Sequence, residues 1–227
     1  MTVKEVLIEL KSLSTPDHFA KLARFGINDS KAFGVKVPLL RLLAKRTGKN
    51  HELALELWDT DIHEARLLAS MIENPSAIDE IQFDAWVNDF DSWDICDGCC
   101  SLLGKTAFSF QKITEYSSRK EEFVKRTAFV LMCEQAVHHK NVEDEQFYPF
   151  FEIIEREACD DRNFVRKAVN WALRQIGKRN ERLRIKAIET CAHLLLQDSK
   201  SARWIAKDAL RELNSREVIV RTNNKRK

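Results

Sequence analysis

Apolar residues recur every three or four positions along almost the whole chain, and strand-like alternation is missing from the pattern. The first such run covers residues 2–13. A second starts at Pro16 and should end at Gly26, because proline suits a first helical turn and glycine a helix end. Residues 26–35 lack the spacing and predict a loop, after which Pro38 fits the start of another helix. The pattern therefore predicts an all-α protein.

Ten more helices are expected after that one, separated by glycine, proline and short polar breaks. Their predicted ranges are 51–58, 62–72, 79–90, 93–103, 108–116, 121–137, 145–158, 162–176, 181–196 and 201–213. Asp61 and Ser92 are the expected N-caps of the helices at 62–72 and 93–103. Gly104 is expected to end the helix at 93–103, and Gly177 the helix at 162–176. Residues 215–227 are polar and basic, and predict a frayed, flexible tail.

Two short internal repeats indicate how these helices are organised. Phe-Val-Lys-Arg at 123–126 recurs 41 positions later as Phe-Val-Arg-Lys, and Ala-Leu-Arg at 172–174 recurs 37 positions later. Both periods are close to the length of a two-helix HEAT or armadillo unit. We therefore predict one domain over residues 1–214, an α-solenoid of about five or six HEAT-like helix pairs with a concave face.

Charge is nearly balanced overall but strongly segregated along the chain. The net charge is +2, yet residues 162–186 hold nine Lys or Arg against Glu181 alone, and residues 52–97 hold thirteen Asp or Glu against Arg66 alone. Such polarity is typical of a surface that binds a polyanion, which predicts a cationic concave cleft. The alternative is that these charges lie on solvated helix faces that differ only in the sign of their charge and bind nothing.

Trp93 and Asp97 are the strongest candidates for chemistry. They lie four positions apart, so a helix places the indole and the carboxylate on one face. A flat π-surface beside a fixed anion suits a short-lived cation such as an oxocarbenium ion. A structural ion pair between Asp97 and Arg126, joining neighbouring repeats, is the alternative.

Trp171 has Lys167 four positions before it and Arg174 three positions after it, so all three share a helix face. An aromatic ring flanked by cations is a recurrent nucleic-acid surface. A core tryptophan with cations extending past it to solvent is the other interpretation. The remaining tryptophans, at positions 58, 86 and 204, are assigned to packing.

The sequence lacks the motifs that mark several functional classes. Cys96, Cys99 and Cys100 have no second cysteine pair or histidine pair to complete a zinc site, so buried small residues are expected, with no metal and no cofactor. Phosphate-loop, dinucleotide-binding and Gly-x-Ser-x-Gly patterns are missing. Without a secretory signal or a long apolar run, we expect a reduced, cytoplasmic protein without membrane contact, and a monomer.

Four stretches, taken in order, resemble the AlkD-like DNA alkylation-repair family of HEAT-like repeat DNA glycosylases. The stretches are Gly-Val-Lys-Val-Pro-Leu-Leu-Arg at 34–41, Trp-Asp-Ile-Cys-Asp at 93–97, Val-Lys-Arg-Thr-Ala at 124–128 and Lys-Ala-Val-Asn-Trp-Ala-Leu-Arg at 167–174. The resemblance covers the chain from Phe33 to about Leu213.

The resemblance implies excision of cationic N3- or N7-alkylated purines from double-stranded DNA. It assigns Asp97 to the catalytic carboxylate, Trp93 and Trp171 to the aromatic pair beside the deoxyribose, and Arg126 to the cleft arginine. The side chains expected to bind DNA are Lys36, Arg41, Lys125, Arg166, Lys167, Arg174 and Lys178.

One segment departs from the family pattern. Active members carry a helix just before the Gly-x-x-x-Pro start, whereas residues 24–30 here contain Gly26 and loop-forming residues. The sequence is closer to a branch that keeps the cleft but lacks this substrate-recognition helix. Three hypotheses follow: a glycosylase, a non-catalytic protein that recognises unusual DNA structure, and a protein-interaction solenoid.

Overall fold

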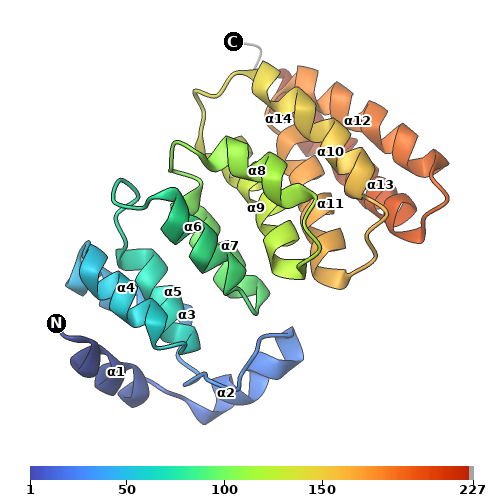
Figure 1. Ribbon diagram of the computed structural model, residues 1–227. Coiled ribbons are helices and arrows are strands. Elements are labelled where there is room, and N and C mark those ends of the chain that lie inside the picture. The colour runs from blue at the N-terminus through green and yellow to red at the C-terminus, as the bar shows by residue number, and fades with distance from the viewer. Residues whose placement is uncertain (225–227) are drawn as a thin grey trace. The chain divides into compact units, whose positions relative to one another are not determined.

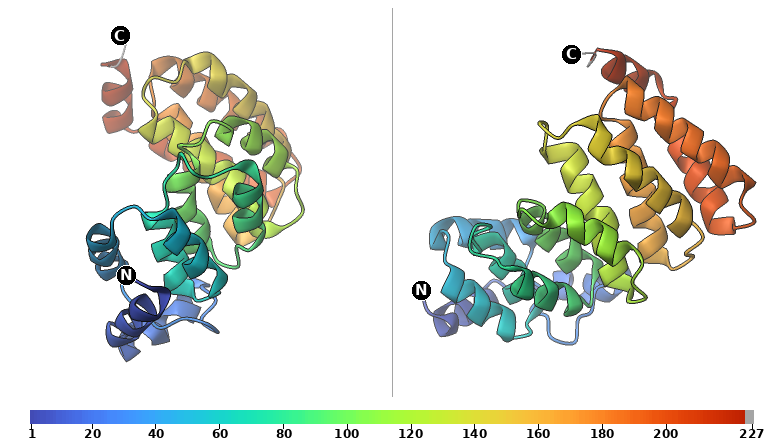
Figure 2. Two further views of the ribbon diagram at one scale, coloured as in Figure 1. Left: turned by 60° about the vertical axis from the view of Figure 1, so that its left-hand side comes forward. Right: turned by 45° about the horizontal axis from the view of Figure 1, so that its top comes forward.

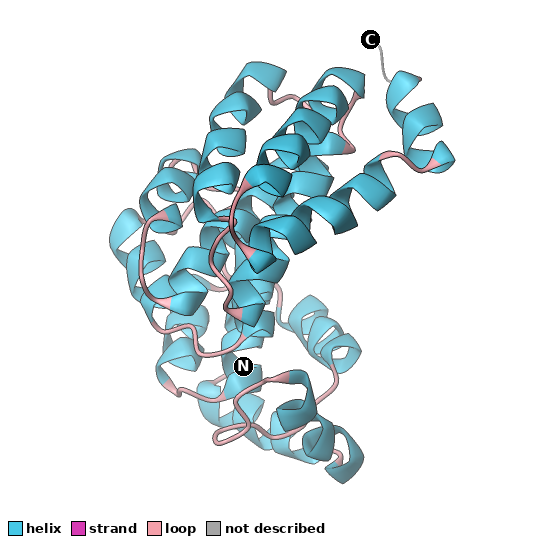
Figure 3. Ribbon diagram, turned by 90° about the vertical axis from the view of Figure 1, so that its right-hand side faces the viewer, coloured by secondary structure: helices cyan, strands magenta, loops and turns pink. Residues whose placement is uncertain are grey.

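The structure, a computed structural model that describes residues 1–224, is helical throughout these residues and contains no strand among them (Figure 1). Figure 3 shows the helices joined by loops. The all-α prediction is therefore confirmed. The chain divides into two compact units, Met1–Ala107 and Phe108–Lys227. The prediction of one domain over residues 1–214 stays a prediction.

The first unit contains seven α-helices and one 3-10 helix among the described residues. They are α1 (Val3–Ser12), α2 (Pro16–Leu22), η1 (Ala23–Phe25), α3 (Val37–Thr47), α4 (His51–Asp59), α5 (His63–Ile72), α6 (Glu80–Asn88) and α7 (Trp93–Leu103). Helix α5 packs against α3 on one side and α7 on the other, while α4 packs on α5. Trp58 and Trp86 stack between α4 and α6, with ring centroids 4.1 Å apart. Both indoles are buried, which confirms their assignment to packing.

The second unit is also made of helices that pack on one another (Figure 2). Its helices are α8 (Ser109–Ser117), α9 (Glu122–His138), η2 (Asp144–Phe147), α10 (Tyr148–Glu157), α11 (Asn163–Gly177), α12 (Glu181–Leu196), α13 (Lys200–Leu213) and α14 (Arg216–Asn223). Helices α9, α11 and α13 pack in succession, and α8 and α12 pack against this row. Phe123 and Phe164, equivalent residues of the 41-residue repeat, lie 5.6 Å apart between ring centroids.

Of the two predicted N-caps, that at Asp61 is wrong and that at Ser92 is confirmed in position. Asp61 does not cap α5; it adopts a left-handed conformation (φ 57°), which aspartate tolerates, and its carboxylate pairs with Lys31 and Arg66. Ser92 does occupy the N-cap position of α7, but its buried hydroxyl makes no cap hydrogen bond.

The tail beyond Ser215 also differs from the prediction. It forms α14 as far as Asn223, because Ser215 caps the helix and Val218 and Thr222 lie one turn apart on a buried face. The flexible tail was predicted over residues 215–227, of which 225–227 lie outside the described residues.

All six cysteines lie within the described residues, and only Cys159 is exposed. Burial holds the pKa of the Cys99 and Cys100 thiols well above the usual value and raises that of Cys191 to about 12. The expectation that residues 96, 99 and 100 are buried small residues is confirmed. Within residues 1–224, no group of His, Cys, Asp and Glu side chains could hold a metal ion. In that same part of the chain, no helix is both long enough and apolar enough to cross a bilayer.

Candidate nucleic-acid interface

Trp93 and Asp97 lie one helical turn apart at the start of α7, as their spacing predicts, and both side chains are half-buried. The opposite face of α7 is apolar and packs on α5, where Gly98 permits a close approach. A Cβ at Gly98 would lie only 3.2 Å from the Leu67 side chain. Helix α7 is therefore held firmly while its Trp93 and Asp97 edge remains partly accessible.

The N-terminal segment fixes the indole of Trp93. Trp93 Nε1 donates a hydrogen bond to the backbone carbonyl of Phe25 at 2.8 Å. Three residues further along the segment, Asn28 Nδ2 donates to Asp91 Oδ2 at 2.6 Å. The turn around Phe25 is thus joined at two points to the beginning of α7.

The predicted loop between α2 and α3 is anchored by one buried carboxylate, that of Glu64. The backbone N–H groups of Phe33, Gly34 and Val35 donate to Glu64 at 2.8, 2.6 and 3.0 Å. Glu64 is only 1% exposed. Gly34 has a φ of 78°, and a Cβ there would lie 2.7 Å from Cβ of Phe19. The loop is therefore held in a defined conformation within the first unit.

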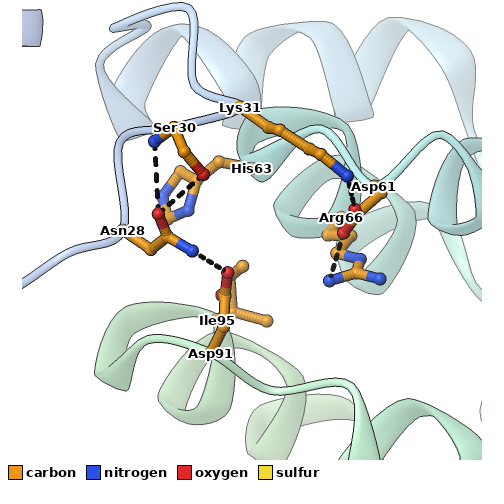
Figure 4. Close-up of a pocket in the computed structure, with 8 residues that line it drawn as sticks. All are labelled: Asn28, Ser30, Lys31, Asp61, His63, Arg66, Asp91 and Ile95. Atoms are coloured by element: carbon orange, nitrogen blue, oxygen red, sulfur yellow. Dashed lines mark hydrogen bonds and ion pairs between the residues drawn. The ribbon is translucent and has the colours of Figure 1, made fainter.

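A polar pocket of about 180 Å³ lies between this loop and helices α5 and α7 (Figure 4). At its edge Asp61 pairs with Lys31 and Arg66, and the hydrogen bond from Lys31 is the main cause of a lowered Asp61 pKa. His63 lies in the same wall. It is 5% exposed, its Nε2 lies 2.9 Å from Asp94 Oδ2, and its Nδ1 has no hydrogen-bond partner among residues 1–224.

The environment of His63 changes its proton affinity. Burial by itself would lower the pKa of the imidazole. The hydrogen bond to Asp94 and the negative charges of Asp94, Glu64 and Asp91 outweigh burial, so the pKa lies above its usual value.

In the second unit, α9 positions two cations that the sequence predicts to face DNA. Arg126 is 6% exposed, and its guanidinium donates to the carbonyl of Phe164 at 2.7 Å. Lys125 Nζ lies 2.5 Å from Glu157 and 3.4 Å from Asp160. Both side chains join neighbouring repeats of the second unit, so each carries a structural role beside the predicted one.

Helix α11 carries the remaining aromatic candidate, Trp171, which is half-buried. Its Nε1 donates to the side-chain oxygen of Gln175, one turn along the helix, at 2.9 Å. Lys167 and Trp171 lie on the same helix as predicted, and Lys167 is exposed.

Arg174 of α11 and Lys178, which directly follows the helix, are paired with carboxylates of α13. Glu212 accepts from Arg174 and, at 2.6 Å, from Lys178. Arg174 also lies 3.7 Å from Asp208. Although burial raises the pKa of Glu212, the hydrogen bonds from Lys178 and Arg174 lower it overall, so the carboxylate stays ionised. Phosphate contacts by Arg174 and Lys178 must compete with Glu212.

Arg166 lies over the ring of Trp204, with its guanidinium carbon 4.7 Å from the centroid. Trp204 is 39% exposed, so it contributes a surface in addition to packing. In the first unit, Lys36 and Arg41 are exposed at and near the start of α3.

Sequence reasoning missed the exposed aromatic ring of Phe25 and the stack of Arg166 on Trp204. Phe25 gave one usable signal, an aromatic residue between a cation and a helix-ending glycine. The spacing from Arg166 to Trp204 gave no signal in the sequence that the two side chains stack.

A family model described as "DNA alkylation repair enzyme" matches residues 6–213. A comparison with solved structures finds a chain from a study described as "A new family of proteins related to the HEAT-like repeat DNA glycosylases with affinity for branched DNA structures". The two chains are 20% identical with a TM-score of 0.78, and the match covers 93% of this chain and 95% of the other. The comparison with curated proteins finds no match.

Proposed function

The chain belongs to the DNA alkylation repair enzyme family, and on this premise we propose that it removes alkylated purines from double-stranded DNA. The substrate would be a purine alkylated at N3 or N7, and the reaction would be hydrolysis of its N-glycosidic bond. The protein would need no cofactor.

The observation that supports this proposal best is the pairing of Trp93 and Asp97 on one edge of α7, with Trp93 held by the carbonyl of Phe25. An alkylated purine is already cationic, so the bond between C1′ and the base nitrogen can break with both electrons going to the base. The sugar then carries the positive charge. A carboxylate in a water-poor place stabilises that charge, and an indole face adds to the stabilisation.

Asp97 would also orient the water that completes the reaction. The water oxygen bonds to C1′, and its proton passes to the carboxylate and then to solvent. Because the base leaves as a neutral molecule, no strong general acid is required. Trp171 is proposed as the second aromatic surface, and exposed Lys167 as a phosphate contact.

The alternative is recognition of unusual DNA structure without excision. Two observations favour it. The structurally similar chain is described as having affinity for branched DNA, and residues 26–36 are non-helical. This hypothesis predicts salt-sensitive binding and no released base.

Release of free base from duplex DNA carrying N3- and N7-methylpurines distinguishes the two. Asp97→Asn keeps the size of the side chain and removes its charge. We expect base release to fall by about a hundredfold or more, while DNA affinity changes less than about twofold.

Asp59→Asn is the matched control, because this exposed carboxylate at the end of α4 lies outside the proposed site. Base release by Asp97→Asn at the parental rate would rule out the proposed role of Asp97. DNA binding without release by any of the three proteins would establish the non-catalytic alternative.

A further inference from the structure

Phe25 presents the most exposed aromatic ring of the N-terminal segment. It ends the one-turn helix η1, and the residue is 60% exposed. A single exposed apolar side chain is common on protein surfaces, so the surroundings of Phe25 decide whether it is a contact surface. Neither the packing of the first unit nor the proposed glycosylase chemistry uses this ring.

The turn that carries Phe25 is well defined. Gly26 follows in a left-handed conformation (φ 69°), and its N–H donates to the carbonyl of Ala23 at 3.0 Å. The next N–H, that of Ile27, donates to the carbonyl of Leu22 at 3.1 Å. Leu22 and Ile27 are both buried. The core thus holds both flanks of the turn and leaves Phe25 at its outer end.

The same turn is attached to the candidate site, because its carbonyl accepts the hydrogen bond from Trp93. A molecule that contacts Trp93 therefore lies close to the backbone of Phe25. Two exposed cations lie nearby. Arg24 belongs to the same turn, and Lys21 belongs to the last turn of α2, just before it. An aromatic ring flanked by cations suits a nucleobase with its neighbouring phosphates better than it suits an apolar protein surface.

We propose that Phe25 stacks on a base pair that a DNA branch, nick or end leaves uncovered, while Lys21 and Arg24 contact the adjoining phosphates. An intact duplex offers no free base face in its interior, so Phe25 would raise affinity for branched DNA selectively. This proposal rests on the proposed DNA binding and adds the element that would give it structural preference.

The test compares Phe25→Ala, Phe25→Trp and the parent on a three-way DNA junction and an intact duplex with closed hairpin ends. We expect Phe25→Ala to weaken junction binding by about tenfold and duplex binding by less than about twofold. Phe25→Trp should retain the preference, because it keeps an aromatic face. The control is Ile81→Ala on α6, which removes an apolar side chain that is 80% exposed; it should change neither affinity.

A second readout follows stacking directly. With 2-aminopurine at the branch point, the parent and Phe25→Trp should change its fluorescence on binding, and Phe25→Ala should lose most of that change. Equal junction affinity and equal fluorescence change for the parent and Phe25→Ala would overturn the proposal. Failure of the parent to bind either DNA would instead overturn the proposed function, so the two failures are distinguishable.

Discussion

Trp93 and Trp171 are both half-buried indoles on α-helices, one in each unit, yet the chain holds them in different ways. Trp93 donates to a carbonyl that lies 68 positions earlier in the sequence, whereas Trp171 donates to Gln175 on its own helix. The orientation of Trp93 therefore depends on an intact N-terminal segment. The hydrogen bond of the Trp171 indole stays within α11.

The charged side chains around the two indoles differ as well. In the first unit, the buried Glu64 is used to organise backbone N–H groups. In the second unit, Glu212 offsets Arg174 and Lys178, the cations that the sequence predicts to face DNA. A count of basic residues therefore overstates the positive charge that α11 offers to phosphate.

The largest expected effect follows from removing the Glu64 carboxylate, which anchors the loop before α3 in the first unit. Glu64→Ala would leave three backbone N–H groups without their acceptor, and we expect a loss of about 3 kcal/mol in the free energy of unfolding. The indole N–H resonance of Trp93 should shift, while that of Trp171 should not. Urea unfolding and a nitrogen–proton correlation spectrum measure both quantities.

Glu64→Gln serves as the milder variant, since its amide oxygen keeps one acceptor in place. We expect it to lose less stability than Glu64→Ala. Equal shifts at Trp93 and Trp171 would contradict the difference in how the two indoles are held.

The second prediction tests how far Glu212 offsets the positive charge of the second unit. Glu212→Gln removes the carboxylate shared by Arg174 and Lys178, which frees Lys178 for phosphate and leaves Arg174 beside Asp208 alone. We expect duplex DNA to bind about fivefold more tightly, with a log–log salt slope steeper by about one to two. Glu217→Gln on α14 removes an exposed carboxylate instead and controls for net charge. An unchanged salt slope in Glu212→Gln would place both cations outside the DNA contact.

The smallest effect is a pH dependence confined to the first unit. Since the pKa of His63 is raised in the folded protein, its protonation contributes stability that is fully present below the usual value of 6.5. That contribution is lost as the pH rises through the higher folded pKa. Asp94→Asn should flatten this part of the stability profile, as measured by urea unfolding between pH 5.5 and about 8.5. A profile with the same slope in both proteins would show that Asp94 does not raise the pKa of His63.

Much of the fold follows from local signals in the sequence. Gly26 ends the second helical segment and Pro38 lies in the first turn of α3, as glycine and proline predict. The four-residue spacing of Trp93 and Asp97 placed them correctly on one turn of α7. These features depend on residues within about one helical turn of each other, which a sequence pattern can report.

The missed features depend on partners far away in the chain. Glu64 follows His63 at the start of a helical run, and nothing nearby indicates that it receives the backbone of residues 33–35. Glu212 lies 38 positions after Arg174. Composition misled the prediction for the tail, because two buried residues one turn apart sufficed to dock α14 despite its polar sequence.

The exposed Cys159 has a practical consequence for experiments on this protein. The pKa of the Cys99, Cys100 and Cys191 thiols is raised, and the thiolate is the nucleophile that attacks a maleimide. Cys96 and Cys133 are buried too. A fluorophore or spin label should therefore react at Cys159, just beyond α10, without any substitution. The natural sequence thus supplies its own attachment point for distance measurements on labelled DNA complexes.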